Sequence, residues 1–282
     1  MKAIILAAGI GRRLSPLTDR TPKCLLDVGG KSLLERMLSS LSEVGIKEAV
    51  LVVGHLKELI RERIGTRCAG LQARYIENPE YSRGSIRSLW HARGELREES
   101  LVMDADVLFP TPLLHRLLSA PDGSALCLDE AFTDSGEEMK LFVQGDRVVA
   151  ISRKAPARPY DPVGEGVGFM KCSAPHGHLL ATILEEMVRD GADGDYENAI
   201  DRLLRQAHVG WVAVNGLPWT EIDFADDLRR AQEEILPRIE SSGAGDRGPG
   251  AANPKSEIGN PKSNVRTPNP PLTHPCQGRT PN

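Results

Sequence analysis

Residues 2–14 read KAIILAAGIGRRL, a short apolar run that passes directly into a glycine-rich loop with two arginines. The run from Lys2 to Leu6 is typical of a buried strand. Glycines in the loop let the backbone approach a ligand closely, and successive amides can point at phosphate oxygens. Arg12 and Arg13 add fixed positive charge at the same place. This stretch predicts a strand followed by a phosphate-binding loop, although an ordinary tight turn with surface arginines fits it as well.

The loop matches neither of the two common phosphate-binding motifs. Leu14 stands where a dinucleotide-binding fingerprint has its third glycine, and no Gly-Lys-Ser/Thr step closes the loop as in a P-loop. The loop could therefore belong to a different kind of nucleotide site, or it could be an ordinary turn.

Short apolar runs alternate with amphipathic stretches as far as residue 118. The predicted strands are Lys2 to Leu6, Ala49 to Val53, Ala73 to Ile76 and Leu101 to Met103. The predicted helices are Leu33 to Val44, Leu56 to Ile64, Ser85 to Arg93 and Pro112 to Leu118. Such a succession favours a mainly parallel sheet with helices on both faces. Ligands of these sheets bind outside the carboxyl ends of the strands, which directs attention to the loops after Leu6 and Met103.

The second half of the chain predicts an antiparallel extension of that sheet. Its strands are Met139 to Val143, Val148 to Ser152 and Val167 to Lys171, with a turn at Gly145-Asp146. The remaining elements are helices at Leu179 to Val188 and Glu197 to Gln206, a strand at Trp211 to Val214, and a helix from Phe224 to about Leu236. The predicted fold class is α/β, with a Rossmann-like three-layer α/β/α arrangement, a mainly parallel mixed sheet and a small antiparallel extension.

We predict a domain over residues 1–240 and a disordered low-complexity tail over residues 241–282. The tail is rich in Gly, Pro, Asn and Ser and has few apolar residues, and Asn253-Pro254-Lys255-Ser256 recurs at residues 260–263. Such a composition cannot bury enough surface to offset the entropy of ordering.

Composition restricts the class of protein. The formal net charge of −4 provides no basic field, so we expect no nucleic-acid partner. No stretch approaches the ~20 apolar residues of a membrane span, and the apolar run before Gly9 is too short for a secretory signal. The five cysteines are widely spaced and the seven histidines show no zinc-binding pattern. We expect a cytoplasmic protein without a membrane partner; whether it forms a homodimer is left open.

A lysine in a rigid turn follows the glycine loop, in Thr21-Pro22-Lys23-Cys24-Leu25-Leu26. Together, Leu-x-Ala-Gly-x-Gly-x-Arg-Leu and Pro-Lys-x-Leu closely resemble the signature of the nucleotidyltransferase superfamily that includes sugar-1-phosphate nucleotidyltransferases. The resemblance covers residues 1 to about 236. It implies that the loop wraps an NTP while Arg and Lys hold its phosphates. The residues concerned are Leu6, Ala7, Ala8, Gly9, Gly11, Arg12, Arg13 and Lys23.

Two carboxylates, Asp104 and Asp106, come at the end of a predicted strand. Alone, Asp-x-Asp is weak and also fits a helix cap before Pro110. Hard oxygen ligands at a phosphate site suit Mg²⁺. The resemblance implies that such an Asp binds the catalytic metal together with a second Asp later in the chain. The segment Glu221-Ile222-Asp223 contains that second Asp. We predict that Asp106 and Asp223 bind Mg²⁺, with a supporting role for Asp104 near the nucleotide and for Glu221 near the acceptor.

The segment from Asn78 to Ser88 lies where the resembling family contacts its nucleobase. Asn78, Ser85 and Ser88 could read a base edge or a ribose, or simply form a turn and cap a helix.

Later strands carry candidate contacts to an acceptor. Lys140 and Lys154 could neutralise an acceptor phosphate, or could be solvated lysines that protect an edge strand. The resemblance implies acceptor contact by a Lys on these strands and by Glu165 in a Glu-Gly step. An aromatic or carboxylate pocket would suit a choline-type ammonium. Its candidates are Tyr160, Asp161, Tyr196, Glu197 and Trp219.

In finer detail the chain resembles the phosphocholine cytidylyltransferase branch. Asn78 and Tyr81 before Gly-Ser-x-x-Ser-Leu, Glu138-Met139-Lys140 and Trp219-Thr220-Glu221-Ile222-Asp223 carry this resemblance, whereas the branch often has Asn at the position of Ser85. It implies a Mg²⁺-dependent transfer of NMP, from CTP by preference, to a phosphorylated small molecule. The predicted catalytic residues are Arg13, Lys23, Asp106 and Asp223. The alternatives are a sugar-1-phosphate nucleotidyltransferase, using UTP, dTTP or GTP, and a non-catalytic nucleotide sensor.

Overall fold

The main sheet is built around its first strand. The computed structural model describes residues 1–121, 123–154 and 163–244. β1 (Lys2–Ala7) pairs in parallel with β4 (Glu48–Val53) on one side and β7 (Ser100–Asp104) on the other. β6 (Leu71–Glu77) continues the parallel order beside β4, and the two-residue β5 (Arg67–Cys68) pairs with it in antiparallel fashion. The four predicted parallel strands are confirmed.

An antiparallel extension continues the sheet beyond β7. The long β12 (Val163–Cys172) pairs with β7, and the hairpin of β10 (Lys140–Gln144) and β11 (Arg147–Ser152) pairs with β12. β9 (Ser124–Asp129), which the sequence pattern did not predict, also pairs with β12, and β13 (Val209–Ala213) runs parallel to β9. The predicted extension is confirmed and is larger than expected.

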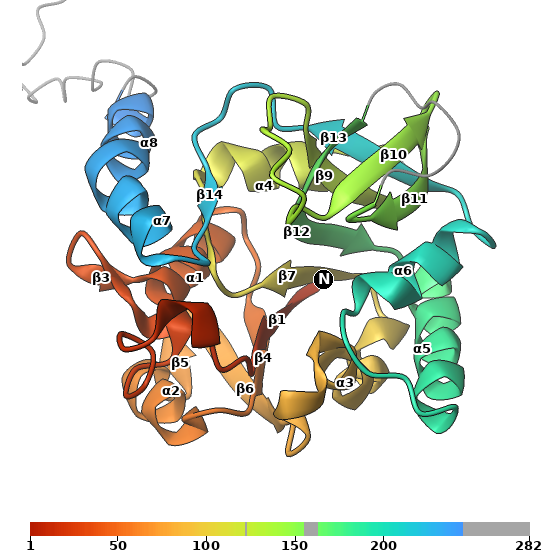
Figure 1. The fold of residues 1–282 in the computed structure, drawn as a ribbon, viewed down its shortest axis with the longest axis horizontal. Helices are drawn as coiled ribbons and strands as arrows, with labels where there is room; N and C mark the ends of the chain where they lie inside the picture. Colours follow the sequence, from red (N-terminus) through yellow and green to blue (C-terminus); the bar gives the residue numbers. More distant parts are fainter. Residues whose placement is uncertain (122, 155–162, 245–282) are drawn as a thin grey trace, which may run out of the picture. The chain divides into compact units, whose positions relative to one another are not determined.

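Helices cover both faces of the sheet, as predicted (Figure 1). Alternate residues of β1 supply opposite faces: Ala3 and Ile5 belong to one core cluster and Ile4 to another. The first cluster holds α1 (Leu33–Glu43), α2 (Lys57–Ile64) and α4 (Thr111–Leu118). The second holds α3 (Ser85–His91), α5 (Ala174–Arg189) and α6 (Glu197–Leu204). Burial of apolar side chains on both faces therefore holds the three layers together.

Short elements shape the loops at the carboxyl ends of the strands. They are single 3₁₀ turns at Arg12–Leu14, Lys23–Leu25 and Tyr81–Arg83, a longer one at Arg93–Arg97, and the hairpin of β2 (Asp27–Val28) and β3 (Lys31–Ser32). A second small sheet joins β8 (Val107–Leu108) to β14 (Thr220–Glu221), which lie far apart in the sequence.

The closing helix is longer than predicted. It comprises α7 (Ala225–Arg230), a π-helical turn at Ala231–Ile235 and α8 (Leu236–Ala244). α8 runs four residues past the predicted boundary at residue 240, and the division into a domain and a tail stays a prediction. Ala231, Ile235 and Leu236 are buried with Leu14 and Val28 in one core cluster, and this packing holds the π-helical turn and the start of α8 in place. The rest of the predicted tail, from 245 onward, lies outside the described residues. No helix in the described ranges is long and apolar enough to cross a membrane.

Candidate active site

Two cavities open at the carboxyl ends of β1 and β7. The smaller has a volume of about 210 Å³ and the larger about 570 Å³. Asp104, the last residue of β7, lines both of them. All described residues of the smaller wall precede residue 107, whereas the larger wall, apart from Arg13 and Asp104, is made by residues from 126 onward. The two cavities are thus built by different parts of the chain.

Pairing of β8 with β14 brings three carboxylates together. Val107 lies opposite Glu221 in the register, and the Ile222 amide donates to the Asp106 carbonyl at 3.1 Å. As a result, one carboxylate oxygen each of Asp106, Glu221 and Asp223 lies within 4.8 Å of the others. The predicted pair of Asp106 and Asp223 is therefore adjacent in space, and Glu221 joins it.

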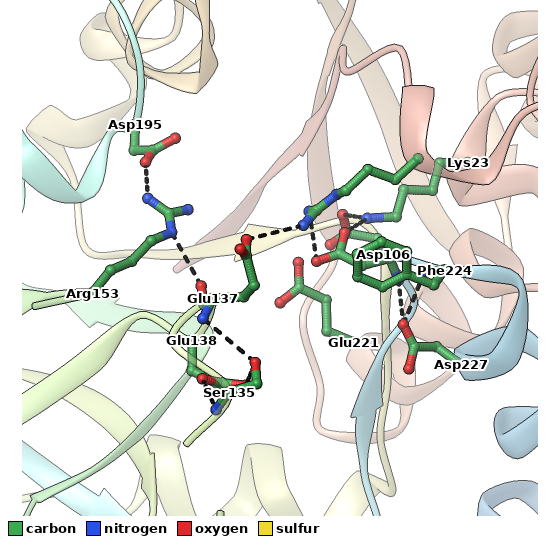
Figure 2. A network of polar contacts seen from close by, with 12 residues as sticks. Lys23, Asp106, Ser135, Glu137, Glu138, Arg153, Asp195, Glu221, Phe224 and Asp227 are labelled. Carbon is green, nitrogen blue, oxygen red and sulfur yellow. Dashed lines mark hydrogen bonds and ion pairs between the residues drawn. The ribbon is translucent and has the colours of Figure 1, made fainter. Parts of the chain in front are cut away.

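Lys23 lies between the two aspartates (Figure 2). Its Nζ donates to Asp106 Oδ2 at 2.7 Å and to Asp223 Oδ1 at 2.6 Å. Burial alone lowers the pKa of Lys23, but the charges of Asp106 and Asp223 outweigh it and raise this pKa above its ordinary value. Arg13 adds a second cation, with its guanidinium 2.6 Å from Asp223 Oδ2. The four predicted catalytic residues thus form one cluster.

The donor set of this cluster fits a hard divalent cation. Asp106 Oδ1 is buried and has no hydrogen-bond partner among the described residues. Burial, then the charges of Asp106 and Asp223, raise the pKa of Glu221 to about 8. Carboxylates crowded in this way repel one another, and a cation relieves the repulsion. Oxygen ligands of this kind suit Mg²⁺, for which Asp106 and Asp223 would be the ligands.

Most residues predicted to bind the nucleotide line the smaller cavity. These are Leu6, Ala7, Ala8, Gly9, Lys23, Ser85, Ser88 and Asp104. Gly11 lies outside that wall, in left-handed backbone with φ of 69°, and a side chain there would press on Thr18 and Lys23. Arg12 is exposed and lines neither cavity, whereas Arg13 lines the larger one. The loop after β1 therefore borders a cavity, and of its two arginines only Arg13 lines a cavity wall.

The polar residues after β6 form hydrogen bonds within the protein, and some of them also line the smaller cavity. Asn78 is buried and lines neither cavity; its amide donates to Ser88 Oγ at 2.9 Å, and its oxygen accepts from the Glu80 amide. Ser85 Oγ accepts from the Tyr196 amide at 2.9 Å and does not cap the helix. Asn78 thus fixes Ser88, while Ser85 links α3 to the segment that carries Tyr196.

Five of the residues predicted to bind the acceptor line the larger cavity: Glu165, Tyr196, Glu197, Trp219 and Glu221. Lys140 is buried and forms an ion pair with Asp134 at 2.6 Å, and Lys154 is exposed; neither lines the cavity. Their contact with an acceptor stays a prediction that this geometry does not support. Tyr160 and Asp161 lie outside the described residues.

Several cavity residues were missed by sequence reasoning, namely Asp129, Glu137, Arg153 and Arg230. Arg153 donates from Nε to the Glu137 carbonyl at 3.1 Å and pairs with Asp195, while the Glu137 carboxylate lies 3.8 Å from Arg13 (Figure 2). Arginines and glutamates of this kind are usually solvated surface residues, and no local motif marks them. The segment after β9 is thereby tied to the loop after β1.

Negative charge dominates the larger cavity. Burial, then the charges of Glu138 and Asp129, raise the pKa of Glu165 to about 7, against the opposing charge of Arg230. Burial also raises the pKa of Glu197 to about 7, with a contribution from Asp195. The Tyr196 hydroxyl donates to Asp104 Oδ2 at 3.0 Å, and a side chain at Gly168 would clash with the same carboxyl. The wall between the two cavities is therefore tightly packed.

Comparison with known proteins agrees with this geometry. Residues 3–142 match the MobA-like NTP transferase domain. The chain is 31% identical over 245 residues to the CMP-5'-(3-aminopropyl)phosphonate synthase of Streptomyces rubellomurinus, covering 84% of this chain and 39% of that relative. It thus spans about two fifths of that relative's length.

A shorter relative is covered almost completely. The chain is 30% identical over 246 residues to the choline-phosphate cytidylyltransferase of Streptococcus pneumoniae, covering 84% of this chain and 98% of that protein. The solved structure of the CTP:phosphocholine cytidylyltransferase from Streptococcus pneumoniae superimposes with a TM-score of 0.63 at 28% identity, covering 82% of this chain and 97% of that one.

Proposed function

Because the chain belongs to the nucleotidyltransferase family of the pneumococcal choline-phosphate cytidylyltransferase, we propose that it transfers CMP from CTP to a phosphorylated small molecule and releases pyrophosphate. One observation carries the proposal: the two cavities meet at Asp104, beside the cluster of Lys23, Asp106 and Asp223. A nucleotide in the smaller cavity and an acceptor in the larger one would place their reacting atoms at that cluster.

The proposed reaction is a single displacement at phosphorus. An anionic oxygen of the acceptor's phosphate or phosphonate forms a bond to the α-phosphorus of CTP. The bond from that phosphorus to the bridging oxygen breaks, and pyrophosphate leaves with the electron pair. The attacking oxygen is already ionised at neutral pH, so the protein needs no general base, and its task is to position and stabilise charge.

The chain's own cations fit the leaving group. Lys23 and Arg13 would bind the pyrophosphate oxygens, in exchange for their present contacts with Asp106 and Asp223. When bound by those aspartates, Mg²⁺ supplies further stabilisation of the charge at the α-phosphate. Gly9 and its neighbours border the smaller cavity, where their amides can approach phosphate oxygens.

Two properties support a small acceptor such as phosphocholine or a related phospho-alcohol or phosphonate. The larger cavity, at about 570 Å³, has room for a small molecule, and its wall is rich in carboxylates that suit a cationic end group. The relatives named above are called a phosphonate and a choline-phosphate enzyme. The sensor alternative is disfavoured, because a sensor has no need of the complete Lys23, Asp106 and Asp223 cluster.

Pyrophosphate release by the purified protein tests the proposal. Four NTPs are crossed with phosphocholine, aminoethylphosphonate, inositol 1-phosphate and glucose 1-phosphate, in the presence of Mg²⁺ or EDTA. We expect release with CTP and a phospho-alcohol or phosphonate, lost with EDTA and in Asp106→Asn. Release with UTP or dTTP and glucose 1-phosphate alone would instead establish the sugar-1-phosphate alternative. Absence of pyrophosphate release from folded protein with every pair of substrates would refute the proposed function.

A further inference from the structure

We propose that Phe224 is a positioning residue of the transfer reaction: the face of its ring holds the Arg13 guanidinium beside the reacting cluster once Asp223 has released it. This inference rests on the proposed function and adds to it a residue that acts through Arg13.

Phe224 occupies a position at which a phenylalanine is unfavourable. It is the N-cap residue of α7, where Ser, Thr, Asp or Asn would accept a hydrogen bond from the helix. Its side chain offers no such acceptor, is 46% exposed, and belongs to none of the core clusters formed by the described residues. Neither capping nor burial in the core therefore explains a phenylalanine here. Residues that break a local rule in this way are commonly found at functional sites.

The backbone around Phe224 is nevertheless fixed. Asp227 Oδ2 accepts from the Asp223 amide at 3.0 Å and from the Phe224 amide at 2.8 Å (Figure 2). The Phe224 carbonyl accepts in turn from the Asp227 amide at 3.1 Å. Asp227 thus anchors two successive residues, and it holds the carboxylate of Asp223 and the ring of Phe224 next to each other at the cluster.

The Arg13 guanidinium has three contacts within the part of the chain that the structure describes. It lies 2.6 Å from Asp223, 3.8 Å from Glu137 and 5.1 Å from the centroid of the Phe224 ring. The contact with Glu137 joins two side chains that are 46% and 69% exposed, and such a pair contributes little to holding a cation in place. Asp223 and Phe224 therefore determine where the guanidinium lies.

These two contacts have different consequences for the proposed reaction. Asp223 is a proposed metal ligand, and it neutralises the charge of an Arg13 guanidinium that stays on it, although the pyrophosphate needs that charge. The face of an aromatic ring attracts a cation through its quadrupole and leaves the cation its full charge. The Phe224 ring can therefore keep Arg13 in place while Asp223 exchanges it for another cation.

Steady-state kinetics of Phe224→Leu and Phe224→Tyr tests this role. Leucine keeps an apolar side chain but removes the ring face, whereas tyrosine retains the face. We expect kcat/KM for CTP to fall about 3–30-fold in Phe224→Leu, as for the loss of a cation–π contact, and to stay near wild type in Phe224→Tyr. In an Arg13→Gln background, Phe224→Leu should have no further effect, and an equal loss in both backgrounds would overturn the inference.

The choice of acceptor separates action through Arg13 from direct contact with the substrate. A ring that acts through Arg13 should lower kcat/KM in Phe224→Leu equally for phosphocholine and for propyl phosphate, which lacks a cationic end group. A larger loss with phosphocholine would show that the ring contacts the acceptor instead. Leu59→Ala is the matched control, because Leu59 is an apolar residue of similar exposure, 37%, that lines neither cavity; it should behave as wild type.

Phe224→Ser separates a functional role from a structural one. Serine can cap α7, so Tm should equal that of wild type or exceed it by a few °C, while kcat/KM falls as in Phe224→Leu. A Tm that falls together with activity would assign the phenylalanine to the stability of the fold and would refute the inference.

Calorimetric binding of pyrophosphate, in the presence of Mg²⁺, distinguishes this inference from the proposed function. Tighter binding by wild type and Phe224→Tyr than by Phe224→Leu, without turnover of any substrate pair, would keep the Phe224 assignment and refute the transferase proposal. Turnover of CTP by wild type, with equal pyrophosphate affinity in all three proteins, would do the opposite.

Discussion

Replacing Lys23 by Met tests whether this lysine and a divalent cation compete for the same carboxylates. Its ammonium lies 2.7 Å from Asp106 and 2.6 Å from Asp223, and its side chain is 13% exposed. Methionine has a similar volume but no charge. The substitution leaves Asp106, Asp223 and Glu221 crowded together, with Arg13 on Asp223 as the remaining cation paired with them in the part of the chain that the structure describes.

The cost follows from the burial of the cluster. Breaking a fully buried ion pair costs about 3–5 kcal/mol. Because Asp106 and Asp223 are 23% and 22% exposed, water screens part of the repulsion, and we expect a loss of about 2–3 kcal/mol. In a domain of this size that lowers Tm by roughly 5–10 °C. Mg²⁺ should restore most of the loss, since the ion meets the same carboxylates without displacing an ammonium group.

Calorimetric unfolding with EDTA and with Mg²⁺ measures both effects. The expected result is a larger Mg²⁺-dependent rise in Tm for Lys23→Met than for wild type. Lys57→Met is the control: it breaks a more exposed pair with Glu77 and should cost less than about 1 kcal/mol without changing the response to Mg²⁺. An equal rise in Tm for wild type and Lys23→Met would refute the idea that lysine and metal compete for one position.

Three further changes address separate parts of the molecule. Asp106→Asn should lower kcat by about a hundredfold to a thousandfold or more and keep Tm, as followed by pyrophosphate release and thermal unfolding; near-normal turnover would remove Asp106 from the metal site. Glu165 has its pKa raised from 4.5 to about 7, so its ionisation destabilises the fold increasingly between those pH values. After allowance for solvent screening, Glu165→Gln should raise the free energy of unfolding by about 1 kcal/mol at pH 8 and leave it unchanged at pH 4, as measured by denaturant unfolding. An unchanged free energy of unfolding at pH 8 would contradict the raised pKa of Glu165. Gly84 has φ of 108°, and a Cβ there would lie 2.3 Å from the Gly194 carbonyl oxygen. Gly84→Ala should therefore lower the free energy of unfolding by about 1–3 kcal/mol and raise the KM for the nucleotide. Gly94→Ala is the control, because Gly94 has open space around it and its substitution should be neutral in the same assays.

The larger features of the fold could be predicted because local pattern and burial agree. The apolar run of β1 fills both faces of the sheet, and the amphipathic stretches that follow it cover those faces. The two-residue strands β8 and β14 could not be predicted, since a pair of residues shows no periodicity. Their pairing nevertheless brings Asp106 to Asp223. β9 was missed for a related reason, because a short apolar run does not by itself distinguish strand from helix.

The candidate site, like the fold, could be predicted from the sequence only in part. The proximity of Lys23 to the two aspartates could be predicted because the glycine loop and the Pro-Lys motif resemble a family that implies it, although Asp-x-Asp alone is weak. The lysines of the later strands could not be placed from sequence, because the ion pair of Lys140 with Asp134 depends on how the preceding loop folds. Asn78 was expected at the nucleobase, but it is buried against Ser88, where its hydrogen bonds satisfy a polar group out of contact with water. Arg153 and Arg230 reach the cavity through tertiary packing that no spacing in the sequence reveals.

The division of the two cavity walls at about residue 107 has a consequence for how such enzymes diversify. Among the described residues the two walls share Asp104 alone, and apart from Asp104 and Arg13 the larger wall begins at residue 126. If the smaller cavity holds the nucleotide and the larger one the acceptor, as proposed, substitutions in β9, β12 and α6 can change the acceptor and leave the smaller wall as it is. A mutagenesis library aimed at new acceptors can leave the first hundred residues constant, and descendants of one ancestor could inherit the same nucleotide while their second substrates drift apart.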